Sequence, residues 1–377
     1  MVKKVIIAGA GGIGRACALM LLQKYKKEIL ITLADVDPDQ LTAARRWISG
    51  GLDHDAEQLM LQDLSEVDTD TWTPDTDLLL DCTPGRFAVH MAKISLRAGA
   101  HYANLTEWIR ATEEILDLAE NASSGFALQT GLAPGFINLY ARWLIRHFKK
   151  THPDVSPSEV KMRVGALSRY ASSPAFYAFT WSPVGVSAEY LNDSEVLRDS
   201  RCIRVPALSQ REQLLIDGEW FEADLTSGGA ADLPQHFEHK IQTLDYKSLR
   251  YPGHFDWVKK IMEKNPEASP AVLTGRFMTE VPFHDEDRIL LYVSVAGSGE
   301  DKRKYEMVRH REILPLRKNQ IRLSAIQRTT AASLAQTAEL LLKGKISGPL
   351  LQSQYPLDEF LNGSFIRDHY GDVTHDF

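Results

Sequence analysis

The sequence predicts an α/β protein with a doubly wound parallel sheet, followed by an α+β region whose sheet is mostly antiparallel. Over roughly the first 150 residues, short apolar runs alternate with helical segments, which is typical of parallel strands joined by right-handed crossovers. After about residue 155 the runs become strand-like with hairpin signals between them, which favours antiparallel pairing. A chain of 377 residues exceeds one ordinary core, so two domains are expected.

The first elements follow one another closely. Residues 4–8 form a short apolar run of the kind that a fully buried parallel strand gives. A helix is expected from residue 12 to about residue 24, and a second strand over 29–35. Pro38 suits the first turn of the next helix, with Asp37 as its N-cap.

The remaining elements are predicted from the same periodicities. In the first half, strands are expected at 58–61, 78–82, 101–104 and 126–129, and helices at 88–98 and 112–122. In the second half, strands are expected at 159–167, 201–205, 212–216, 288–296 and 319–327, with a hairpin turn at Asp217-Gly218. An amphipathic helix over 329–343 ends at Gly344.

A glycine-rich turn separates the first strand from the first helix. The segment GAGGIG, which begins at Gly9, matches the pattern GxGxxG in the setting of a Rossmann βαβ unit. Gly9 permits the tight turn, Gly11 allows close backbone approach to a pyrophosphate, and Gly14 lets helix and strand pack closely. Gly12 and Ile13 complete the loop, whose N–H groups at the start of the helix favour an anion. The motif predicts a dinucleotide site made of these five residues.

The end of the second strand indicates which dinucleotide is bound. Asp35 lies about 20 residues beyond the glycine motif, where an acidic residue meets the adenosine ribose. A carboxylate accepts both ribose hydroxyls and repels a 2′-phosphate, and Val36 supplies no cation for one. The sequence therefore favours NAD as the cofactor over NADP.

Two further strand ends are expected to lie near the cofactor. Asp63, just past the third strand, either binds the adenine edge or caps a helix. Thr83 and Pro84 leave the fourth strand at its carboxyl end, where open α/β sheets bind their ligands. Cys82 beside them is interpreted as a small core residue rather than a nucleophile.

The composition excludes several classes of partner. The formal net charge is −7, so neither a nucleic-acid surface nor an anionic membrane surface is expected. The three cysteines share no metal-ligand spacing, and a reducing cytoplasm fits them best. The apolar N-terminal stretch contains Arg15 and several glycines, so we expect a buried strand and helix there rather than a signal or membrane segment.

Several longer segments resemble the saccharopine dehydrogenase family, including its relatives that oxidise lysine or make carboxyspermidines. They lie at 9–14, 33–35, 98–102, 131–135, 181–186, 248–254 and 327–331. The first segment is common to Rossmann proteins in general. The segments WSPVGV, which begins at Trp181, and SLRYPGH, which begins at Ser248, are much more specific, and the resemblance covers nearly the whole chain.

By this resemblance the chain has two domains, of which the first is discontinuous. Residues 1–150 and about 325–377 form the Rossmann domain, and residues 151–324 form an inserted α+β domain that contacts substrate and a second subunit. The resemblance implies a homodimer and hydride transfer between nicotinamide and a carbon that bears an amine, without a metal. The partner molecule is then a small amino-acid substrate.

Candidate substrate and catalytic residues come from the same segments. Arg250 is the best candidate for gripping a substrate carboxylate, because a guanidinium binds it through two parallel hydrogen bonds, and Tyr251 lies beside it in the motif. Arg169 is either a second such residue or part of a surface salt bridge. His254 either transfers a proton near neutral pH or caps the helix that follows it. Tyr102 either presents its hydroxyl at the carboxyl edge of the sheet or lies in the core.

Two positions depart from the family pattern. Members that act on saccharopine often have aspartate where this chain has Ala133, and many have it where this chain has Asn104. Both changes remove a carboxylate near the expected active site, where Asn104 is predicted to contact substrate. They favour either a shift toward lysine-type substrates or a loss of activity.

The main hypothesis is an NAD-dependent oxidoreductase that acts on the C–N bond of an amino acid, of the saccharopine dehydrogenase or lysine dehydrogenase type. A carboxyspermidine-forming dehydrogenase is the alternative, since Trp181-Ser182-Pro183 also resembles that branch. A non-catalytic NAD-binding sensor or scaffold is the alternative of another class, and Ala133 and Asn104 are the residues that favour it.

Overall fold

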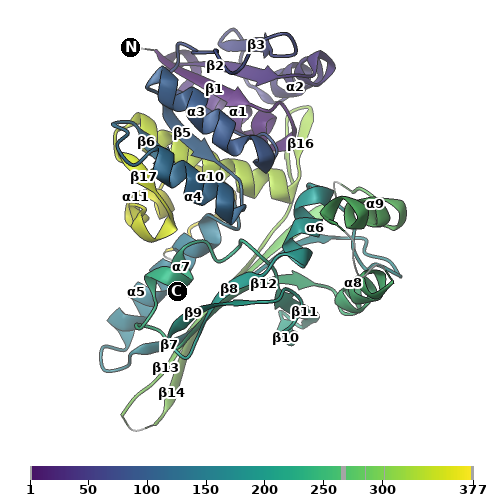
Figure 1. The fold of residues 1–377 in the computed structure, drawn as a ribbon, viewed down its shortest axis with the longest axis vertical. Helices are drawn as coiled ribbons and strands as arrows, with labels where there is room; N and C mark the ends of the chain where they lie inside the picture. The colour runs from purple at the N-terminus through teal and green to yellow at the C-terminus, as the bar shows by residue number, and fades with distance from the viewer. Residues whose placement is uncertain (1, 265–268, 285, 301, 375–377) are drawn as a thin grey trace. The chain divides into compact units, whose positions relative to one another are not determined.

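The computed structural model describes residues 2–264, 269–284, 286–300 and 302–374 (Figure 1). The chain divides into two compact units. The first unit comprises the chain up to Phe136, the segment Leu316–Leu323 and the chain from Gln327 onward. The second unit comprises Ile137–Pro315 and Ser324–Ile326. The sequence placed the first division at about residue 150, whereas the structure places it at the start of a helix, α5 (Phe136–Thr151).

A seven-stranded parallel sheet forms the centre of the first unit. Its strands are β1 (Lys3–Ala8), β2 (Ile29–Asp35), β3 (Leu59–Asp63), β4 (Leu78–Asp81), β5 (His101–Asn104), β6 (Gly125–Ala127) and β17 (Gly348–Leu350). The order is β17-β6-β5-β4-β1-β2-β3, so the sheet grows outward from β1 in both directions, which is the doubly wound arrangement. The C-terminal part of the chain supplies one edge strand, because β17 pairs with β6.

Helices flank this sheet (Figure 1). They are α1 (Gly12–Tyr25), α2 (Pro38–Gly51), α3 (Ala88–Ala98), α4 (Ile109–Leu118), α10 (Ala325–Leu342), α11 (Leu357–Leu361) and α12 (Ser364–Tyr370). α2 begins as expected, with the Asp37 carboxylate accepting hydrogen bonds from the N–H groups of Asp39 and Gln40. α4 begins and ends a few residues before the helix predicted at 112–122.

α10 packs within the first unit from Gln327 onward. Lys24 of α1 forms an ion pair with Glu339 of α10. A Cβ at Gly125 of β6 would lie 2.6 Å from the Leu341 side chain, so α10 also lies close against the sheet. These contacts join α10 to α1 and to β6, the strand next to the edge strand β17.

The segment predicted as the last strand of the second domain, 319–327, is divided between two elements. Ile321–Leu323 is β16, which pairs with β15 (Leu316–Lys318) in a two-stranded hairpin of the first unit. α10 begins directly after it, because the Asp287 carboxylate accepts hydrogen bonds from the first two N–H groups of the helix (2.6 and 2.8 Å). The prediction of one strand was wrong, because the apolar residues there belong to a hairpin and then to a helix.

The second unit is built on a mixed eight-stranded sheet. Its strands are β7 (Pro157–Ser168), β8 (Ser194–Arg198), β9 (Arg201–Val205), β10 (Glu212–Ile216), β11 (Glu219–Leu225), β12 (Thr243–Arg250), β13 (Asp287–Ser298) and β14 (Lys304–Ile313). The main path is β10-β11-β12-β7-β13-β14, and β8 pairs with both β12 and β9. Among the described strands of this second sheet, only β12 and β7 are parallel neighbours. The two sheets together confirm the predicted fold class.

Further helices in the described part of the second unit lie beside α5 in the chain. They are α6 (Pro183–Leu191), α7 (Leu233–His236), α8 (His254–Glu263) and α9 (Pro270–Glu280). An apolar cluster with many aromatic rings, including Tyr177, Phe179, Tyr190, Phe255 and Phe277, lies where α6, α8 and α9 pack together. None of the helices that the structure describes has the length and apolar content needed to cross a membrane.

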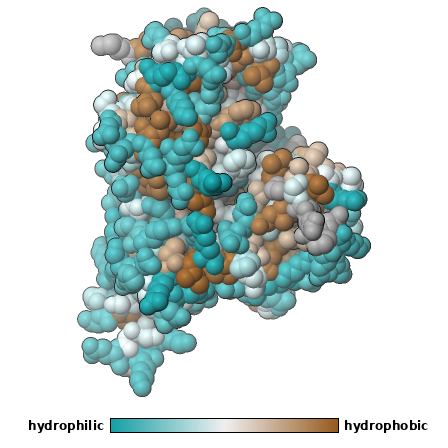
Figure 2. All heavy atoms as spheres, in the orientation of Figure 1, coloured by the Kyte–Doolittle hydropathy of each residue, from teal (hydrophilic) through white to brown (hydrophobic). Residues whose placement is uncertain are grey.

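β13 and β14 form a long hairpin whose outer strand is an edge of the sheet (Figure 1). β14 exposes charged side chains at Lys304, Glu306 and Glu312. Hydrophilic side chains also predominate at the far end of this hairpin (Figure 2). Charges along an edge strand discourage pairing with another chain, so the composition of β14 protects the edge of this sheet.

Candidate dinucleotide and substrate sites

The glycine loop between β1 and α1 brings backbone close to backbone. Gly9 has a φ of +95°, and a Cβ there would lie 2.7 Å from the Cys82 carbonyl oxygen. A Cβ at Gly14 would lie 1.9 Å from the Gly9 oxygen, so only glycine lets helix and strand pack this closely. A Cβ at Gly11 would meet no described atom within 4 Å. The fold itself does not require glycine at position 11, whereas close approach of a ligand does.

The N-terminus of α1 offers its N–H groups to an anion. Gly11 is the N-cap, so no side chain caps the helix, and the first turn carries no acidic residue. The N–H groups of Gly12, Ile13 and Gly14, together with the helix dipole, favour a phosphate there. Gln327 of α10 lies over the same turn, since a Cβ at Gly12 would be 2.8 Å from the Gln327 Nε2. Sequence reasoning missed Gln327, which is remote in the chain.

Two carboxylates lie at the carboxyl ends of the neighbouring strands β2 and β3. Asp35 accepts hydrogen bonds from the N–H groups of Ala10 (2.7 Å) and Asp37 (3.1 Å), and so ties the glycine loop to the end of β2. Asp63 is the register partner of Asp35. It accepts a hydrogen bond from the N–H of Ser65 (2.8 Å), which lowers the pKa of its carboxyl. Asp63 therefore stabilises the turn after β3 at the same edge as Asp35.

A buried carboxylate, Asp81, holds the turn after β4. Its Oδ1 accepts hydrogen bonds from the N–H (2.9 Å) and the hydroxyl (2.6 Å) of Thr83, and Pro84 leads into the 3-10 turn Gly85–Phe87. Burial raises the pKa of the Asp81 carboxyl. Burial also raises the pKa of the Cys82 thiol, which disfavours the reactive thiolate. Sequence reasoning missed Asp81, although an acidic residue that ends an apolar strand was an available signal.

Tyr102 and Asn104 of β5 lie in the core of the first unit. The Tyr102 hydroxyl is 2.8 Å from the Asp81 Oδ2 and 3.0 Å from the Ala88 carbonyl oxygen, and the side chain is fully buried. Asn104 is also buried, and its side-chain oxygen accepts a hydrogen bond from the N–H of Gln129 (2.9 Å). The contacts of Tyr102 match the interpretation as a core residue, and those of Asn104 join β5 to its neighbour, so that its contact with substrate stays a prediction.

Arg250, the last residue of β12, is buried among aromatic rings. Its guanidinium carbon lies 4.8 Å from the centre of the Tyr177 ring. Nε donates to the Tyr190 hydroxyl (2.9 Å), and Nη1 donates to the Leu249 carbonyl (2.8 Å). The side chain is 2% exposed, and no carboxylate among the described residues pairs with it. Arg250 is thus a buried cation whose direct hydrogen-bond partners are neutral.

His254, at the start of α8, has both ring nitrogens engaged. Nδ1 is 2.7 Å from the Ala175 carbonyl oxygen, and Nε2 is 2.9 Å from the Tyr190 hydroxyl. Burial, and then the charge of Arg250, lowers the pKa of His254 to about 3. The imidazole is neutral near pH 7, and the N-cap of α8 is Gly253. The structure therefore favours neither proton transfer nor capping by His254. We call Arg250, Tyr177, Tyr190 and His254 the arginine cluster.

Tyr251 and Arg169 lie apart from the arginine cluster. The Tyr251 hydroxyl donates to the Ser168 carbonyl (3.0 Å) and accepts from the Nε of Arg288 (3.1 Å). Tyr251 packs in a separate apolar cluster, as expected for the residue after Arg250 on an extended chain. Arg169 is 46% exposed and lies 3.7 Å from a Glu286 carboxylate oxygen, which matches the interpretation as a surface salt bridge.

Apart from Tyr102, Asn104, Tyr251 and Arg169, the predicted residues fall into two groups. The glycine loop, Asp35, Asp63 and the Thr83-Pro84 turn follow the carboxyl ends of β1 to β4 in the first unit. Arg250 and His254 meet in the second unit, together with two tyrosines that sequence reasoning missed, Tyr177 and Tyr190. A glycine loop at the switch point of a doubly wound sheet, with uncapped helix N–H groups, defines a dinucleotide-binding protein.

Comparison with known families identifies the class more closely. The model of the saccharopine dehydrogenase NADP binding domain matches residues 5–128, and that of the saccharopine dehydrogenase C-terminal domain matches residues 131–359. The chain belongs to the saccharopine dehydrogenase family of NAD(P)-binding oxidoreductases. The resemblance seen in the sequence is confirmed.

Solved structures share this fold over nearly the full chain. The apo saccharopine dehydrogenase (L-Glu forming) from Saccharomyces cerevisiae has a TM-score of 0.70 and 16% identity, covering 98% of each chain. The homospermidine synthase from Legionella pneumophila, solved in complex with NAD, has a TM-score of 0.71 and 13% identity, covering 98% of this chain and 90% of that one. At these identities the similarity shows the shared fold alone.

Proposed function

We propose that the protein is an NAD-dependent oxidoreductase that acts on the C–N bond of an amino acid, of the saccharopine dehydrogenase or lysine dehydrogenase type. The observation that carries the proposal is the arginine cluster, in which a buried guanidinium has only neutral hydrogen-bond partners. An amino-acid substrate brings a carboxylate that leaves water on binding, and a planar guanidinium matches its geometry.

Arg250 can accept such a carboxylate without losing its present contacts. Nε and Nη1 are held by Tyr190 and by the Leu249 carbonyl, while Nη2 makes no hydrogen bond to any described residue. The buried Glu189 raises the pKa of Arg250 by its charge. A carboxylate ligand would add a charged partner to the two neutral groups that now bind the guanidinium.

The first unit fits the adenosine and pyrophosphate parts of the cofactor. Gly11 leaves room beside the backbone, and the uncapped start of α1 would bind the pyrophosphate. Asp35 would bind the adenosine ribose, and Thr83 and Pro84 would border the nicotinamide half. The cofactor, when bound, supplies the hydride-transfer chemistry. The chain's own residues bind and orient the two molecules.

We favour NAD over NADP because of the end of β2. The Asp35 carboxylate accepts two backbone hydrogen bonds and retains lone pairs for ribose hydroxyls, whereas a 2′-phosphate would be repelled. Val36, which follows, is 65% exposed and offers no cation. The matching family model is described as NADP binding and the Legionella homospermidine synthase was solved with NAD, so the choice of NAD rests on Asp35 and Val36.

Two assays test the proposal. Oxidation of NADH in the presence of lysine and 2-oxoglutarate reports the saccharopine dehydrogenase reaction, and reduction of NAD with lysine alone reports the lysine dehydrogenase reaction. If neither assay showed turnover, that result would contradict the proposal. If NAD still bound tightly, a sensor or scaffold would be favoured, in keeping with Ala133 and Asn104 at positions where many family members have aspartate.

A carboxyspermidine-forming dehydrogenase is the second candidate. The segment WSPVGV favours it, and the structure shows what the segment builds. The Ser182 hydroxyl caps α6 by accepting a hydrogen bond from the N–H of Gly185 (3.2 Å), and Trp181 covers the same glycine. Turnover of reduced cofactor only with an aliphatic diamine plus an amino-acid semialdehyde would replace the first candidate by this one.

We also propose that the protein is a homodimer, which the family resemblance supports. Light scattering of the purified protein gives its mass in solution. A mass near that of one 42.3 kDa chain at all concentrations would contradict the dimer.

A further inference from the structure

The hydrogen bonds of the arginine cluster form a row with a group that can only donate at one end and a group that can only accept at the other. These two groups fix the direction of every hydrogen bond between them. Nε of Arg250 can only donate, so the Tyr190 oxygen accepts from it. The Ala175 carbonyl can only accept, so Nδ1 of His254 carries the ring proton. In the neutral ring Nε2 is then an acceptor, and the Tyr190 hydroxyl donates to it. One series of donors runs from Arg250 through Tyr190 and His254 to Ala175.

A second proton on His254 would disrupt this series. With Nε2 protonated, two donors would face the Tyr190 oxygen, and the hydroxyl proton of Tyr190 would lose its acceptor. The imidazolium would also be buried close to the Arg250 guanidinium, where burial and that charge both oppose it. Geometry and electrostatics therefore keep the ring neutral and in one tautomer.

The surroundings leave the guanidinium little freedom. Tyr190 holds Nε, the Leu249 carbonyl holds Nη1, and the Tyr177 ring covers one face. All four side chains of the arginine cluster are at most 3% exposed, so solvent cannot replace a lost partner within it. Gly253, with a φ of +98°, makes the turn that brings the ring of His254 into this cluster.

We propose that His254 is a positioning residue for substrate binding: it orients the Tyr190 hydroxyl, which in turn fixes the plane of the Arg250 guanidinium. The inference rests on the proposed binding of a substrate carboxylate by Arg250. A guanidinium held in one plane presents Nη2 in one direction, and such preorganisation lowers the cost of binding. His254 acts through two other side chains and moves no proton itself.

Three variants test the proposal by kinetics. Tyr190→Phe removes the hydroxyl but keeps the ring, His254→Leu removes the acceptor, and His254→Gln keeps an amide oxygen that can accept from Tyr190. We expect the first two to raise the substrate KM roughly tenfold to a hundredfold, the effect of weakening a hydrogen bond to a charged group. kcat and NAD affinity should change little, and His254→Gln should recover most of the loss.

A double variant shows whether the two residues act together. Tyr190→Phe with His254→Leu should be no worse than Tyr190→Phe alone, because both changes remove the same hydrogen bond. Additive losses would overturn the proposal, since they would mean separate roles. His310→Gln is the matched control, because His310 is an exposed histidine on β14, and its KM should equal that of the unchanged protein.

The tautomer of His254 gives a readout that does not depend on turnover. In nitrogen-15 spectra, with His254 assigned by its loss in His254→Gln, the ring should be neutral and protonated at Nδ1 from about pH 5 to 9. Titration of His254 near its ordinary pKa would overturn the proposal. So would a His254→Gln variant that loses kcat together with one limb of the pH–rate profile, which is the signature of an acid or base.

Failure of the underlying function is distinguishable from failure of this inference. If Arg250→Ala leaves the substrate KM unchanged while His254 still shows the fixed tautomer, the substrate site is not at Arg250, and both proposals are overturned. If Arg250→Ala raises KM but Tyr190→Phe and His254→Leu do not, only the positioning role is overturned.

Discussion

The second unit buries two arginines in two different ways. Arg163 of β7 is fully buried, with Nε 2.5 Å from a Glu212 oxygen and Nη1 2.6 Å from an Asp245 oxygen. Arg250 is nearly as buried, but its direct partners are a phenol and a backbone carbonyl. In both arginines Nη2 makes no hydrogen bond to a described residue. The two sites therefore differ in the charge of the groups that bind the other guanidinium nitrogens. Arg163 already has two carboxylate partners, whereas the direct partners of Arg250 are neutral, which supports the proposal that Arg250 binds a ligand carboxylate.

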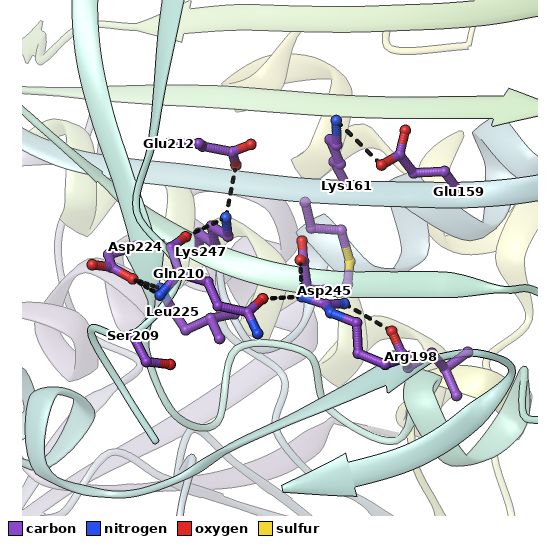
Figure 3. A network of polar contacts seen from close by, with 12 residues as sticks. Glu159, Lys161, Arg198, Ser209, Gln210, Glu212, Asp224, Leu225, Asp245 and Lys247 are labelled. Atoms are coloured by element: carbon purple, nitrogen blue, oxygen red, sulfur yellow. Dashed lines mark hydrogen bonds and ion pairs between the residues drawn. The ribbon is translucent and has the colours of Figure 1, made fainter. Parts of the chain in front are cut away.

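The carboxylates beside Arg163 belong to a network in which every charged side chain pairs with one of opposite sign (Figure 3). We call Arg163, Arg198, Glu212, Asp245 and Lys247 the closed network. Asp245 also pairs with Arg198 (2.7 Å), and Lys247 pairs with Glu212 (3.3 Å). Burial alone would lower the pKa of Arg163, yet Asp245 and Glu212 raise it. Burial alone would raise the pKa of Asp245, yet Arg163 and the other cations lower it. Each charge is stabilised mainly by the others, which indicates a structural role.

Removing one charge from the closed network should lower the free energy of unfolding more than any other change predicted here. Asp245→Asn leaves Arg163 and Arg198 facing a neutral amide, and breaking a buried pair in this way costs about 3–5 kcal/mol. We expect the free energy of unfolding to fall by that amount in urea denaturation. The exposed Arg204, which pairs with Glu195, provides the control: Gln235 also donates to Glu195, so Arg204→Gln should cost less than about 1 kcal/mol. Equal losses in both variants would contradict a distinction between the two kinds of pair.

Arg250→Ala should show a second pattern, in which activity is lost together with the contacts of the buried side chain. Removing the partner of a buried substrate carboxylate costs about 2–5 kcal/mol, so kcat/KM should fall roughly thirtyfold to several thousandfold. NAD affinity should stay nearly unchanged, and Arg250→Lys should rescue only partly, because an ammonium cannot grip both oxygens in one plane. Steady-state kinetics beside a fluorescence titration of NAD measures both. Normal turnover, or loss of NAD binding as severe as the loss of activity, would remove Arg250 from the substrate site.

The closed network should also give a defined pH dependence. Because the pKa of Asp245 is lowered from 3.8, its stabilising contribution is fully present above that value and is lost as pH falls through the lower folded value. The difference in unfolding free energy between the protein and Asp245→Asn should therefore be constant near neutral pH and shrink in acid. Urea denaturation at a series of pH values measures it. A difference that persisted far below the ordinary pKa would argue against the ion pairs as its source.

Asp35, in the first unit, differs from Asp245 because its partners are backbone N–H groups and not cations. Without a cationic partner it should discriminate between cofactors by repulsion, and NAD should bind at least tenfold more tightly than NADP, which is about 1.4 kcal/mol. Fluorescence titration of both cofactors measures the ratio, and Asp35→Asn should reduce it. A preference for NADP would show that the end of β2 does not meet the ribose.

Features that depend on near neighbours could be predicted from the sequence. The glycine loop needs only a strand, three spaced glycines and a helix, all within the first 25 residues. Asp35 follows from the end of the next strand. Arg250 was chosen for its residue type within a specific segment, because few side chains can bind a carboxylate in a buried site, and its binding of substrate stays a prediction. The parallel sheet followed from the repeated alternation of strand and helix.

The state of a buried polar group could not be predicted, because distant residues decide it. Tyr190 and Ala175, which fix the tautomer of His254, lie 64 and 79 residues before it. Asp81, which receives the Tyr102 hydroxyl, lies 21 residues before it. The types of His254 and Tyr102 suggested acid–base chemistry, but their partners make one a neutral acceptor and the other part of the core. No local pattern carries that information.

The pairing of β17 with β6 has a consequence for the order in which the chain is made. Six strands of the first sheet lie within the first 127 residues, whereas the seventh, Gly348–Leu350, comes more than two hundred residues later. On the ribosome, β6 therefore emerges with its outer edge unpaired, and an open edge is a template for pairing with other chains. The whole second unit is synthesised during that interval and can fold first. Arrival of the last strand ends the exposure and completes the nucleotide-binding sheet.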